Sequence, residues 1–444
     1  MKKQSSLIFL LFFLVSNISR AQQINTEETS QSGITHRTCG TETPQAEWDA
    51  WFNEQVEIFK QQSANKTQAS YVIPVVIHLI HGGQAVGTFP NISQVQVNSQ
   101  ITVLNQDYSG TGLNVGNVPS AFSTLISNTN VQFCMATKNP QGSTMTEPGI
   151  DRISYVTKSW SNPTSFTTTT NFRTFMDGTV KPNTIWDPTK YMNIWICDRS
   201  SQTGLLGYAT FPAGSTLTGL SGTGTATTDG FWCWTKSFGN TGTLDPTYNK
   251  GRTATHEIGH WLGLRHIWGD GTCATDYCTD TPPAQSSNFG CPTHPHKTGT
   301  CSGNTTGEMT MNFMDYTDDP CMYMFSPDQR TRIQTAMANG THRKLLGTHG
   351  LCATTGITDN TLENGISIFP VPAHNTITIK LELNSTQDLM FTVFNSLGQE
   401  VFQKSEKNIQ NTNIELNLSA YEKGFYFLRI SDGTSNIDRK IILE

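Results

Sequence analysis

Residues 256–266 read HEIGHWLGLRH, and the spacing of their histidines guides the interpretation of the whole chain. In a helix, His256 and His260 would lie one turn apart on the same face, where both rings can bind one metal ion. Gly263 can adopt the positive φ that ends a helix and turns the chain, which would return His266 as a third ligand. Three neutral imidazoles around zinc leave a fourth position for water, as in a catalytic site.

Glu257 supplies the base that such a site needs. It lies too far round the helix to be a comfortable ligand, but it is well placed to take a proton from a metal-bound water. A bare HExxH also occurs by chance on ordinary surface helices. The added glycine and third histidine make an accidental match implausible.

The composition limits the class of protein. The chain has 444 residues, which exceeds one average domain, and only 14% of them are charged, with a net charge of −6. Such a polar, weakly charged surface offers no basic face, which argues against binding to nucleic acid.

The N-terminus reads as a secretory signal peptide over residues 1–21. Lys2 and Lys3 precede the apolar run Leu7–Val15, and small residues follow up to Ala21. No other run approaches the roughly 20 apolar residues of a membrane span, so we expect no transmembrane segment. Ten cysteines in an exported chain indicate disulfide bonds.

Residues 22–68 are predicted to be a prosegment that is removed on activation. They contain HRTCGTE around Cys39, followed by a predicted helix through Trp48. Because a thiolate is a good zinc ligand, Cys39 could occupy the water position as a zymogen switch. The alternative is that Cys39 forms a disulfide bond.

The pattern over residues 69–346 predicts an α+β fold, with a twisted mixed sheet and helices above a loop-rich lower lobe. A β-branched run from Tyr71 is typical of a buried strand. Val97, Ile101 and Leu104 form the apolar stripe of a helix that packs on a sheet. Further strands are predicted at 131–136, 152–156, 191–197, 207–211 and 231–234.

Residues 207–211, GYATF, have two readings. They are either the sheet edge against which an extended peptide binds or an interior strand.

Two features follow the histidines. Met314 and Tyr316 lie in a turn before a helix that is predicted to begin at a capping box, Ser326 with Gln329, and to end at Gly340. A methionine in such a place is usually core filler.

With NFMDY after it, the histidine motif resembles that of the metzincin metallopeptidases, in which a methionine-containing turn lies beneath the metal. The closer resemblance is to the pappalysin family of that clan, over about residues 34–345. The motifs that carry it, besides the upstream CGTE, are DTPP at 280–283, GCP at 290–292 and DDPCM at 318–322.

The resemblance implies a secreted zinc endopeptidase that is made as a zymogen. It makes Glu257 the general base and Met314 the support beneath the metal. The zinc ligands that it implies are His256, His260 and His266.

Two further roles follow from the resemblance. Tyr316 would donate a hydrogen bond to the developing oxyanion, unless it is merely a packed side chain. Asp319 lies where the pocket for the residue after the scissile bond is expected, and a carboxylate there would favour Arg or Lys. Alternatively, Asp318 and Asp319 cap nearby structure.

Cysteines crowd the region after the histidines. The resemblance implies two disulfide bonds there, and we guess a third between the additional cysteines. The three pairs are Cys273 with Cys301, Cys291 with Cys321, and Cys233 with Cys278.

The resemblance also implies calcium binding in the loop after the third histidine. Asp270, Asp276, Asp280 and Thr281 offer the hard oxygen ligands that calcium prefers. The alternative is that this acidic loop is simply solvated.

Residues 366–444 differ in character, with short alternating strands and no cysteine, and they follow a Gly/Thr/Asn-rich linker at 347–365. They resemble the C-terminal sorting domain of type IX secretion cargo in Gram-negative bacteria, a small all-β sandwich. Val371 departs from the Asn that is usual in that motif. An adhesive β-sandwich module is the alternative.

These observations predict a monomeric enzyme that is exported by the type IX machinery, free or attached to the cell surface, and that cleaves proteins or peptides. The alternative is an exported zinc-containing adhesin without proteolytic activity. The intact Glu257 argues against the adhesin, because a purely structural zinc site needs no base.

Overall fold

The computed structural model describes residues 36–63, 69–214, 220–352, 366–395, 399–432 and 436–444. The predicted signal peptide, the first part of the predicted prosegment and most of the predicted linker lie outside the described residues. Within the described part, no helix is both long enough and apolar enough to cross a membrane.

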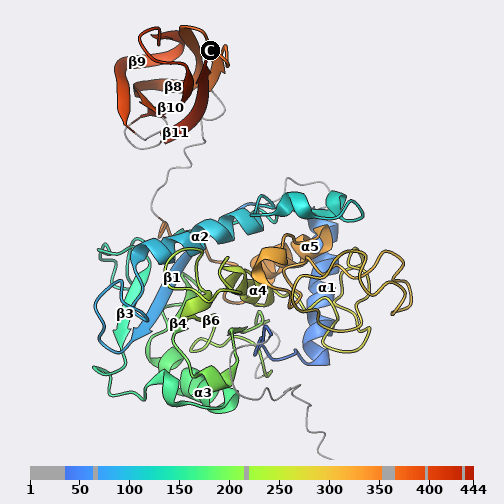
Figure 1. Ribbon diagram of the computed structural model, residues 1–444. Coiled ribbons are helices and arrows are strands. Elements are labelled where there is room, and N and C mark those ends of the chain that lie inside the picture. Colours follow the sequence, from blue (N-terminus) through green and yellow to red (C-terminus); the bar gives the residue numbers. More distant parts are fainter. Residues whose placement is uncertain (1–35, 64–68, 215–219, 353–365, 396–398, 433–435) are drawn as a thin grey trace, which may run out of the picture.

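A six-stranded sheet forms the centre of the first domain, residues 36–352 (Figure 1). Its strand order is β2-β1-β4-β6-β5, and β3 pairs with the second half of β1. All neighbours are parallel except β5 and β6, which makes the sheet mixed, as predicted. The strands are β1 Tyr71–His81, β2 Val131–Met135, β3 Ile150–Ser154, β4 Met192–Cys197, β5 Gly207–Ala209 and β6 Phe231–Trp234.

The predicted strand positions agree with the structure to within two residues. The largest difference is β3, which begins at Ile150, two residues before the predicted strand. β1 is the central strand, and residues 73–80 are all buried, as expected for a parallel strand that is covered on both faces.

Helix α2, Gln94–Tyr108, covers one face of the sheet (Figure 1). Ser93 caps its N-terminus by accepting a hydrogen bond from the Gln96 backbone. The predicted stripe of Val97, Ile101 and Leu104 is buried in the main core. The helical periodicity that was read from the sequence is therefore confirmed.

Helix α4, Arg252–Trp261, follows β6 and is buried along its whole length. Its C-terminus is held by a buried cation. The Arg343 guanidinium bonds both Asp229 oxygens at 2.7 Å and donates to the Trp261 carbonyl at 3.2 Å, while stacking 3.8 Å from the Trp261 ring. A cation at this end satisfies a carbonyl and complements the helix dipole.

Helices α1, Ala46–Ser63, and α5, Pro327–Asn339, pack against each other and share the main core with α4. The predicted capping box of α5 is present. Trp48 and Phe52 of α1 are fully buried in the same core as α4 and α5. The predicted prosegment boundary at residue 68 thus does not coincide with a boundary in packing, because α1 belongs to the core.

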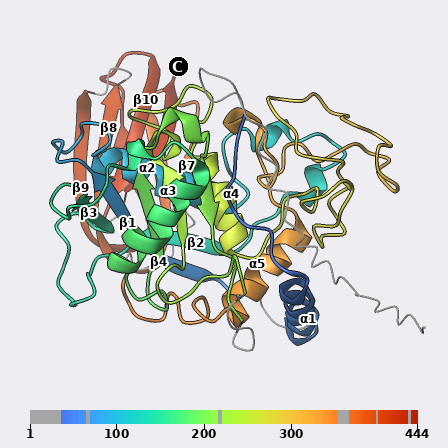
Figure 2. The ribbon, with the colours of Figure 1, turned by 90° about the horizontal axis from the view of Figure 1, so that it is seen from below.

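The segment after α4 forms a loop-rich lobe that lies to one side of that helix in two views (Figures 1 and 2). Its described residues contain one short helical turn, Asp319–Cys321. Disulfide bonds join Cys273 to Cys301 and Cys291 to Cys321, the two pairs that the family resemblance implied.

The guessed pair between Cys233 and Cys278 is wrong, because both thiols are free and buried. Cys233 lies within β6, where its sulfur faces Ser237, whereas Cys278 lies in the loop-rich lobe. An unpredicted disulfide joins Cys134 of β2 to Cys352. Because of this bond, the first domain extends to Cys352, although the linker was predicted to begin at residue 347.

The short helices of the first domain complete its outline. The 3₁₀ turns are Val115–Asn117, Ser123–Leu125, Pro163–Ser165, Lys181–Asn183, Ser201–Thr203 and Thr235–Ser237, and α3, Thr169–Phe175, runs into a π-helical turn, Met176–Val180.

Residues 366–444 form a separate antiparallel sheet with its own core, so the predicted all-β C-terminal domain is confirmed. β10 alternates buried and exposed residues, as a strand with one face on a core does. The strand order is β11-β10-β8-β7, with β9 on β8. The strands are β7 Ile366–Phe369, β8 Thr376–Asn395, β9 Glu400–Asn417, β10 Gly424–Ser431 and β11 Asn436–Leu443.

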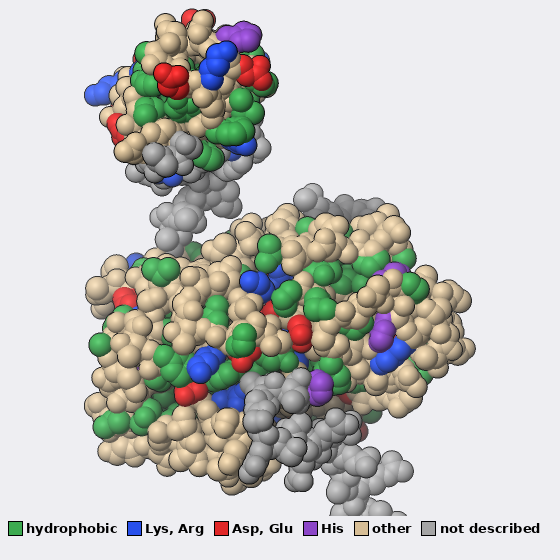
Figure 3. Space-filling view, viewed as in Figure 1, with side chains coloured by type: hydrophobic (Ala, Val, Ile, Leu, Met, Phe, Trp, Pro, Cys, Tyr) green, Lys and Arg blue, Asp and Glu red, His purple; other side chains and the backbone are tan. Residues whose placement is uncertain are grey.

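The surface agrees with the low charge content. The face seen in Figure 3 is mostly neutral, with scattered acidic and basic side chains and no continuous basic area.

Candidate metal centre

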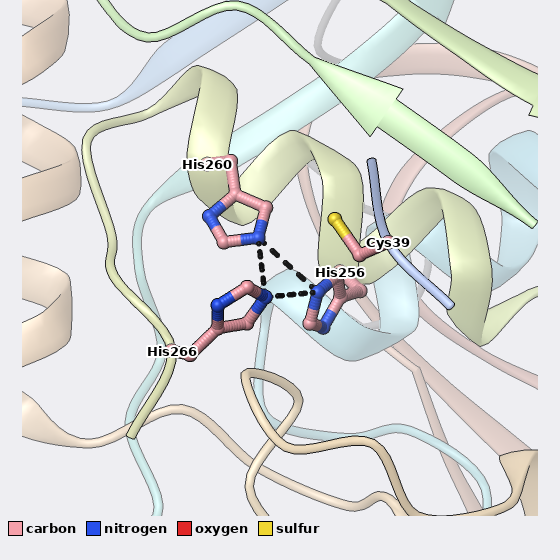
Figure 4. A group of neighbouring side chains, drawn as sticks. All are labelled: Cys39, His256, His260 and His266. Carbon is pink, nitrogen blue, oxygen red and sulfur yellow. Dashed lines mark hydrogen bonds between the residues drawn. The ribbon is translucent and has the colours of Figure 1, made fainter. Parts of the chain in front are cut away.

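Three histidine rings converge at the end of α4 (Figure 4). Their Nε2 atoms lie 3.2 Å apart for His256 and His260, 3.3 Å for His256 and His266, and 3.1 Å for His260 and His266. The chain returns to bring in the third ring because Gly263 has φ 87°. A Cβ at Gly263 would also lie 2.5 Å from the Phe52 ring, so the turn and its packing both require glycine.

Hydrogen bonds at the opposite ring nitrogens determine where the protons are. The Nδ1–H of His256 donates to the Phe313 carbonyl at 2.7 Å, and that of His260 donates to the Leu264 carbonyl at 2.8 Å. The same atom of His266 bonds the Asp270 carboxylate. Since carbonyl and carboxylate oxygens only accept, each Nδ1 carries the proton and each Nε2 presents a lone pair.

The environment of His256 and His260 keeps these two rings neutral. Burial, together with the neighbouring imidazoles, holds the pKa of His256 well below its usual value, and burial lowers the pKa of His260 to about 3. Three lone pairs that face one another are stabilised by a cation between them. A neutral imidazole with an anchored Nδ1–H is the form that binds metals.

The nitrogen separations fit zinc. Tetrahedral zinc with Zn–N bonds of about 2.0–2.1 Å places its ligand nitrogens about 3.3 Å apart. The three separations of 3.1–3.3 Å agree with this value. In the part of the chain that the structure describes, one group of metal-ligand side chains is present: Cys39, His256, His260 and His266, with all ligand atoms within 4.8 Å of one another.

Cys39 enters the group from a separate segment (Figure 4). It is not in a disulfide bond, so the alternative reading of this residue is wrong. Its sulfur lies 3.4 Å from Glu257 Oε2, and the Thr41 hydroxyl donates to the same oxygen at 3.0 Å. Burial and the Glu257 carboxylate raise the pKa of the Cys39 thiol, an effect that a bound divalent cation would reverse.

Glu257 faces the convergent rings from within the core. Its side chain is 1% exposed, and burial raises its pKa to about 7. A Cβ on Gly207 would lie 2.6 Å from Glu257 Cγ, so β5 passes directly over the carboxylate. The residue is thus enclosed between α4 and the sheet edge.

Met314 and Tyr316 lie under and beside the rings. A Cβ on Gly259 would fall 2.3 Å from the Met314 sulfur, so this glycine lets the methionine pack against α4. The Tyr316 ring centroid is 4.9 Å from that of His266 and 5.7 Å from that of His256. Burial raises the pKa of Tyr316, which keeps its phenol protonated and able to donate.

Asp319 is buried and already holds a basic side chain. Its Oδ1 pairs with Arg37 at 2.6 Å, and its Oδ2 accepts the backbone N–H groups of Lys250 and Arg252. Arg37 lies two residues before Cys39 in the same segment. Arg37 was not among the residues predicted from the sequence, although a basic residue so close to the cysteine was a usable signal.

The residues that were predicted to bind calcium are not gathered at one site. Asp270 bonds His266 and Arg265, and Asp280 accepts from Ser326 and the Asp328 backbone at the start of α5. Only Asp276 and Thr281 contact each other, at 2.8 Å. The described residues contain no acidic ligand group here, so calcium stays a prediction that the geometry does not support.

Asp270 instead belongs to a chain of contacts behind the metal centre. Arg265 donates to Asp270 at 3.1 Å and also pairs with Asp49 of α1. It donates as well to the Pro44 carbonyl at 3.1 Å. The position of α1 therefore bears on the orientation of His266, which the sequence did not indicate.

β5 is the last strand of the sheet, so the prediction of an interior strand at GYATF is wrong, and peptide binding at this edge stays a prediction. The segment around Cys39 lies along it in parallel. Gly40 N–H donates to the Gly207 carbonyl at 2.8 Å, and Leu206 N–H donates to the Thr38 carbonyl at 2.9 Å. The edge that a peptide could use is thus occupied by residues upstream of α1.

Comparisons with known proteins agree with this geometry. Residues 174–338 match the family model of pregnancy-associated plasma protein-A, peptidase family M43, and residues 367–444 match a secretion system C-terminal sorting domain. An extracellular metalloprotease of Arthroderma otae is 28% identical over 303 residues, 68% of this chain and 90% of that protein.

Two solved structures from Tannerella forsythia are also similar. A promirolysin mutant is 36% identical with a TM-score of 0.57, over 70% of this chain and 97% of its own. Mature mirolysin in complex with a cleaved peptide is 37% identical with a TM-score of 0.53, over 63% of this chain and 97% of its own.

Replacing Asp270 with Ala should weaken zinc binding by about 10- to 100-fold, because His266 loses the acceptor that orients its ring. Competition with a chelator of known affinity measures the change. The control is Asp276→Ala, which removes a carboxylate of the same lobe that does not contact the histidines. Equal zinc affinity in the two variants would contradict the orienting role of Asp270.

Proposed function

Because the chain belongs to the pappalysin family of metallopeptidases, we propose that it cleaves peptide bonds with a zinc ion held by His256, His260 and His266 and with Glu257 as general base. The protein is a secreted metalloendopeptidase with a C-terminal sorting domain. The observation that carries the residue assignment is the convergence of three unprotonated Nε2 atoms beside a buried carboxylate. An adhesin without activity has no support in these findings.

The protein side chains divide the chemistry among them. When bound, zinc supplies a Lewis acid that polarises the substrate carbonyl and acidifies water. Glu257 takes a proton from the attacking water and passes it to the leaving amine. The Tyr316 phenol donates to the oxygen that gains negative charge. Met314 packs beneath α4 and supports the helix that carries His256 and His260.

Latency follows from the segment at residues 36–44, which would block the centre in two ways. Cys39 would occupy the fourth zinc position, and the backbone of the segment fills the β5 edge. The segment runs parallel to β5, whereas a substrate that adds to this edge in the more stable antiparallel sense would run the other way. Because the segment runs opposite to a substrate, its peptide bonds have the wrong orientation for cleavage at the metal centre.

Activation would remove this segment and leave α1 in place. Trp48 and Phe52 are fully buried, and Asp49 holds Arg265 behind the metal centre. Removing α1 would expose that core and free Arg265. We therefore place the processing site upstream of α1, in contrast to the boundary at residue 68 that composition suggested.

Specificity would depend on Asp319. The buried carboxylate pairs with Arg37 in the precursor, so the pocket accommodates a guanidinium. Loss of the segment would leave it with backbone donors alone, and a substrate Arg or Lys after the scissile bond would replace Arg37. We also expect the type IX machinery to recognise the C-terminal domain.

Replacing Glu257 with Ala should lower kcat for casein or a fluorogenic peptide by at least about 100-fold, because the proton acceptor is lost. Zinc content should not change, since the carboxylate is not a ligand. A chelator should abolish wild-type cleavage, and added zinc should restore it. A wild-type kcat in Glu257→Ala would contradict the mechanism.

Replacing Cys39 with Ala should shorten the lag before the purified precursor becomes active, because the sulfur no longer competes for the zinc. Gel time courses and peptide cleavage follow the conversion, and the control is Glu54→Ala, an exposed position of α1 away from the processing site. N-terminal sequencing of the product should find a start at Gln45 or Ala46, after the removed segment and at the beginning of α1. A lag equal to that of wild type would count against a thiol switch.

Replacing Asp319 with Asn should reduce the preference of the processed enzyme for Arg or Lys over Gln after the cleaved bond by about tenfold or more, since a charged hydrogen bond is lost. A peptide-library cleavage profile measures it. Asp318→Asn removes the adjacent charge and should leave the profile as in wild type. A wild-type profile without basic residues at that position would refute this role.

A further inference from the structure

The segment that crosses the metal centre has a second charged anchor, Glu42. Its Oε1 accepts a hydrogen bond from Arg173 Nη2 at 2.8 Å, and its Oε2 accepts one from the Ser221 hydroxyl. Arg173 belongs to α3, and Ser221 belongs to the segment before β6. Both therefore come from parts of the chain that would remain after activation.

Glu42 lies at the far end of the β5 edge from Arg37. The segment advances along β5 from Thr38, beside Leu206, to Thr41, whose hydroxyl accepts from the Ala209 backbone at 2.8 Å. Arg37 and Glu42 thus lie on opposite sides of Cys39.

Gly222 lets the segment approach closely at this end. It has φ 80°, and a Cβ there would lie 3.3 Å from Glu42 Cβ. A side chain at this position would therefore crowd the chain that occupies the edge.

Arg173 is held in place independently of Glu42. Its guanidinium lies 5.0 Å from the centroid of the Tyr208 ring, and the Tyr208 hydroxyl donates to Asp177 at 2.8 Å. In the described part of the chain, its ion pair is the one with Glu42, and its Nε atom is buried without a hydrogen-bond partner. The loss of Glu42 would leave a positioned guanidinium without an ion-pair partner among the described residues.

We propose that Arg173 and Ser221 form a subsite that binds an acidic side chain of the substrate two or three residues before the scissile bond. The inference rests on the proposed peptidase function. If Asp319 binds the residue after the bond, the opposite end of β5 holds the residues before it. A strand advances about 3.3 Å per residue in either direction, so the three residues from Cys39 to Glu42 span about three substrate residues.

Solvent exposure of Arg173 limits the size of the expected effect. The Arg173 side chain is 25% exposed with Glu42 in place, and a partly exposed pair is worth little. We expect Glu at the matching position to raise kcat/KM about three- to fivefold over Gln. The gain should lie mainly in KM, because this contact is the same in the ground state and the transition state.

Matched quenched-fluorescence peptides test the subsite on the processed enzyme. One parent sequence carries Glu, Gln or Lys at each of the three positions before the cleaved bond. Wild type should prefer Glu at one of the two positions named, and the preference should weaken between 0.05 and about 0.5 M salt, where exposed charges are screened.

Charge reversal distinguishes binding from structural damage. In Arg173→Gln the ratio of kcat/KM for Glu over Gln should fall to about one, and in Arg173→Glu the enzyme should prefer Lys. Lys190→Gln removes an exposed cation elsewhere and should keep the wild-type ratio. A wild-type ratio near one at all three positions, or a Glu preference that survives in Arg173→Glu, would overturn the proposal.

Peptide binding in the Glu257→Ala background separates this inference from catalysis. Fluorescence anisotropy should show tighter binding of the Glu peptide than of the Gln peptide, with the order lost when Arg173→Gln is added. If wild type cleaves no peptide in a zinc-dependent manner, the proposed function fails, and the binding order still decides the subsite.

Discussion

The metal centre depends on hydrogen bonds at the nitrogens that do not face the metal. Each of the three histidines donates its Nδ1 proton to a fixed acceptor, and this choice of tautomer turns three Nε2 lone pairs toward one point. Two acceptors are backbone carbonyls. The third is Asp270, which Arg265 ties to Asp49 of α1, so the orientation of His266 is supported from outside the motif.

The β5 edge connects the groups to which we assign catalysis, latency and specificity. Its backbone passes over Glu257, and it pairs with the segment that carries Cys39. That segment is held by charge at both ends, by Asp319 through Arg37 and by Arg173 through Glu42. In our proposals, Asp319 and Arg173 restrain this segment in the precursor, and the same two side chains would bind a substrate that runs in the opposite direction along β5.

Sequence reasoning succeeded where a feature depends on local geometry. The turn at Gly263, the apolar stripe of α2 and the capping box at Ser326 are properties of a few neighbouring residues, and the structure contains all three. It did not indicate which polar partner a side chain meets. The family resemblance placed Asp270 among possible calcium ligands, a prediction that remains untested, and the structure shows that its carboxylate bonds the His266 ring. Likewise, the guess that the additional cysteines Cys233 and Cys278 pair could not take account of their positions in different parts of the domain, where both thiols are free.

The sequence by itself determined the spacing of the three histidines and the glutamate beside them, the succession of strands and helices and the second, all-β domain, because helical and strand periods are set by consecutive residues. Only the tertiary structure decided which carboxylate each arginine pairs with. Arg37 pairs with Asp319, Glu42 with Arg173, and α1 joins the core although composition placed it in the prosegment. These contacts join residues far apart in the chain. The two ion pairs form because parallel pairing at the β5 edge sets one register for the segment that crosses the metal centre.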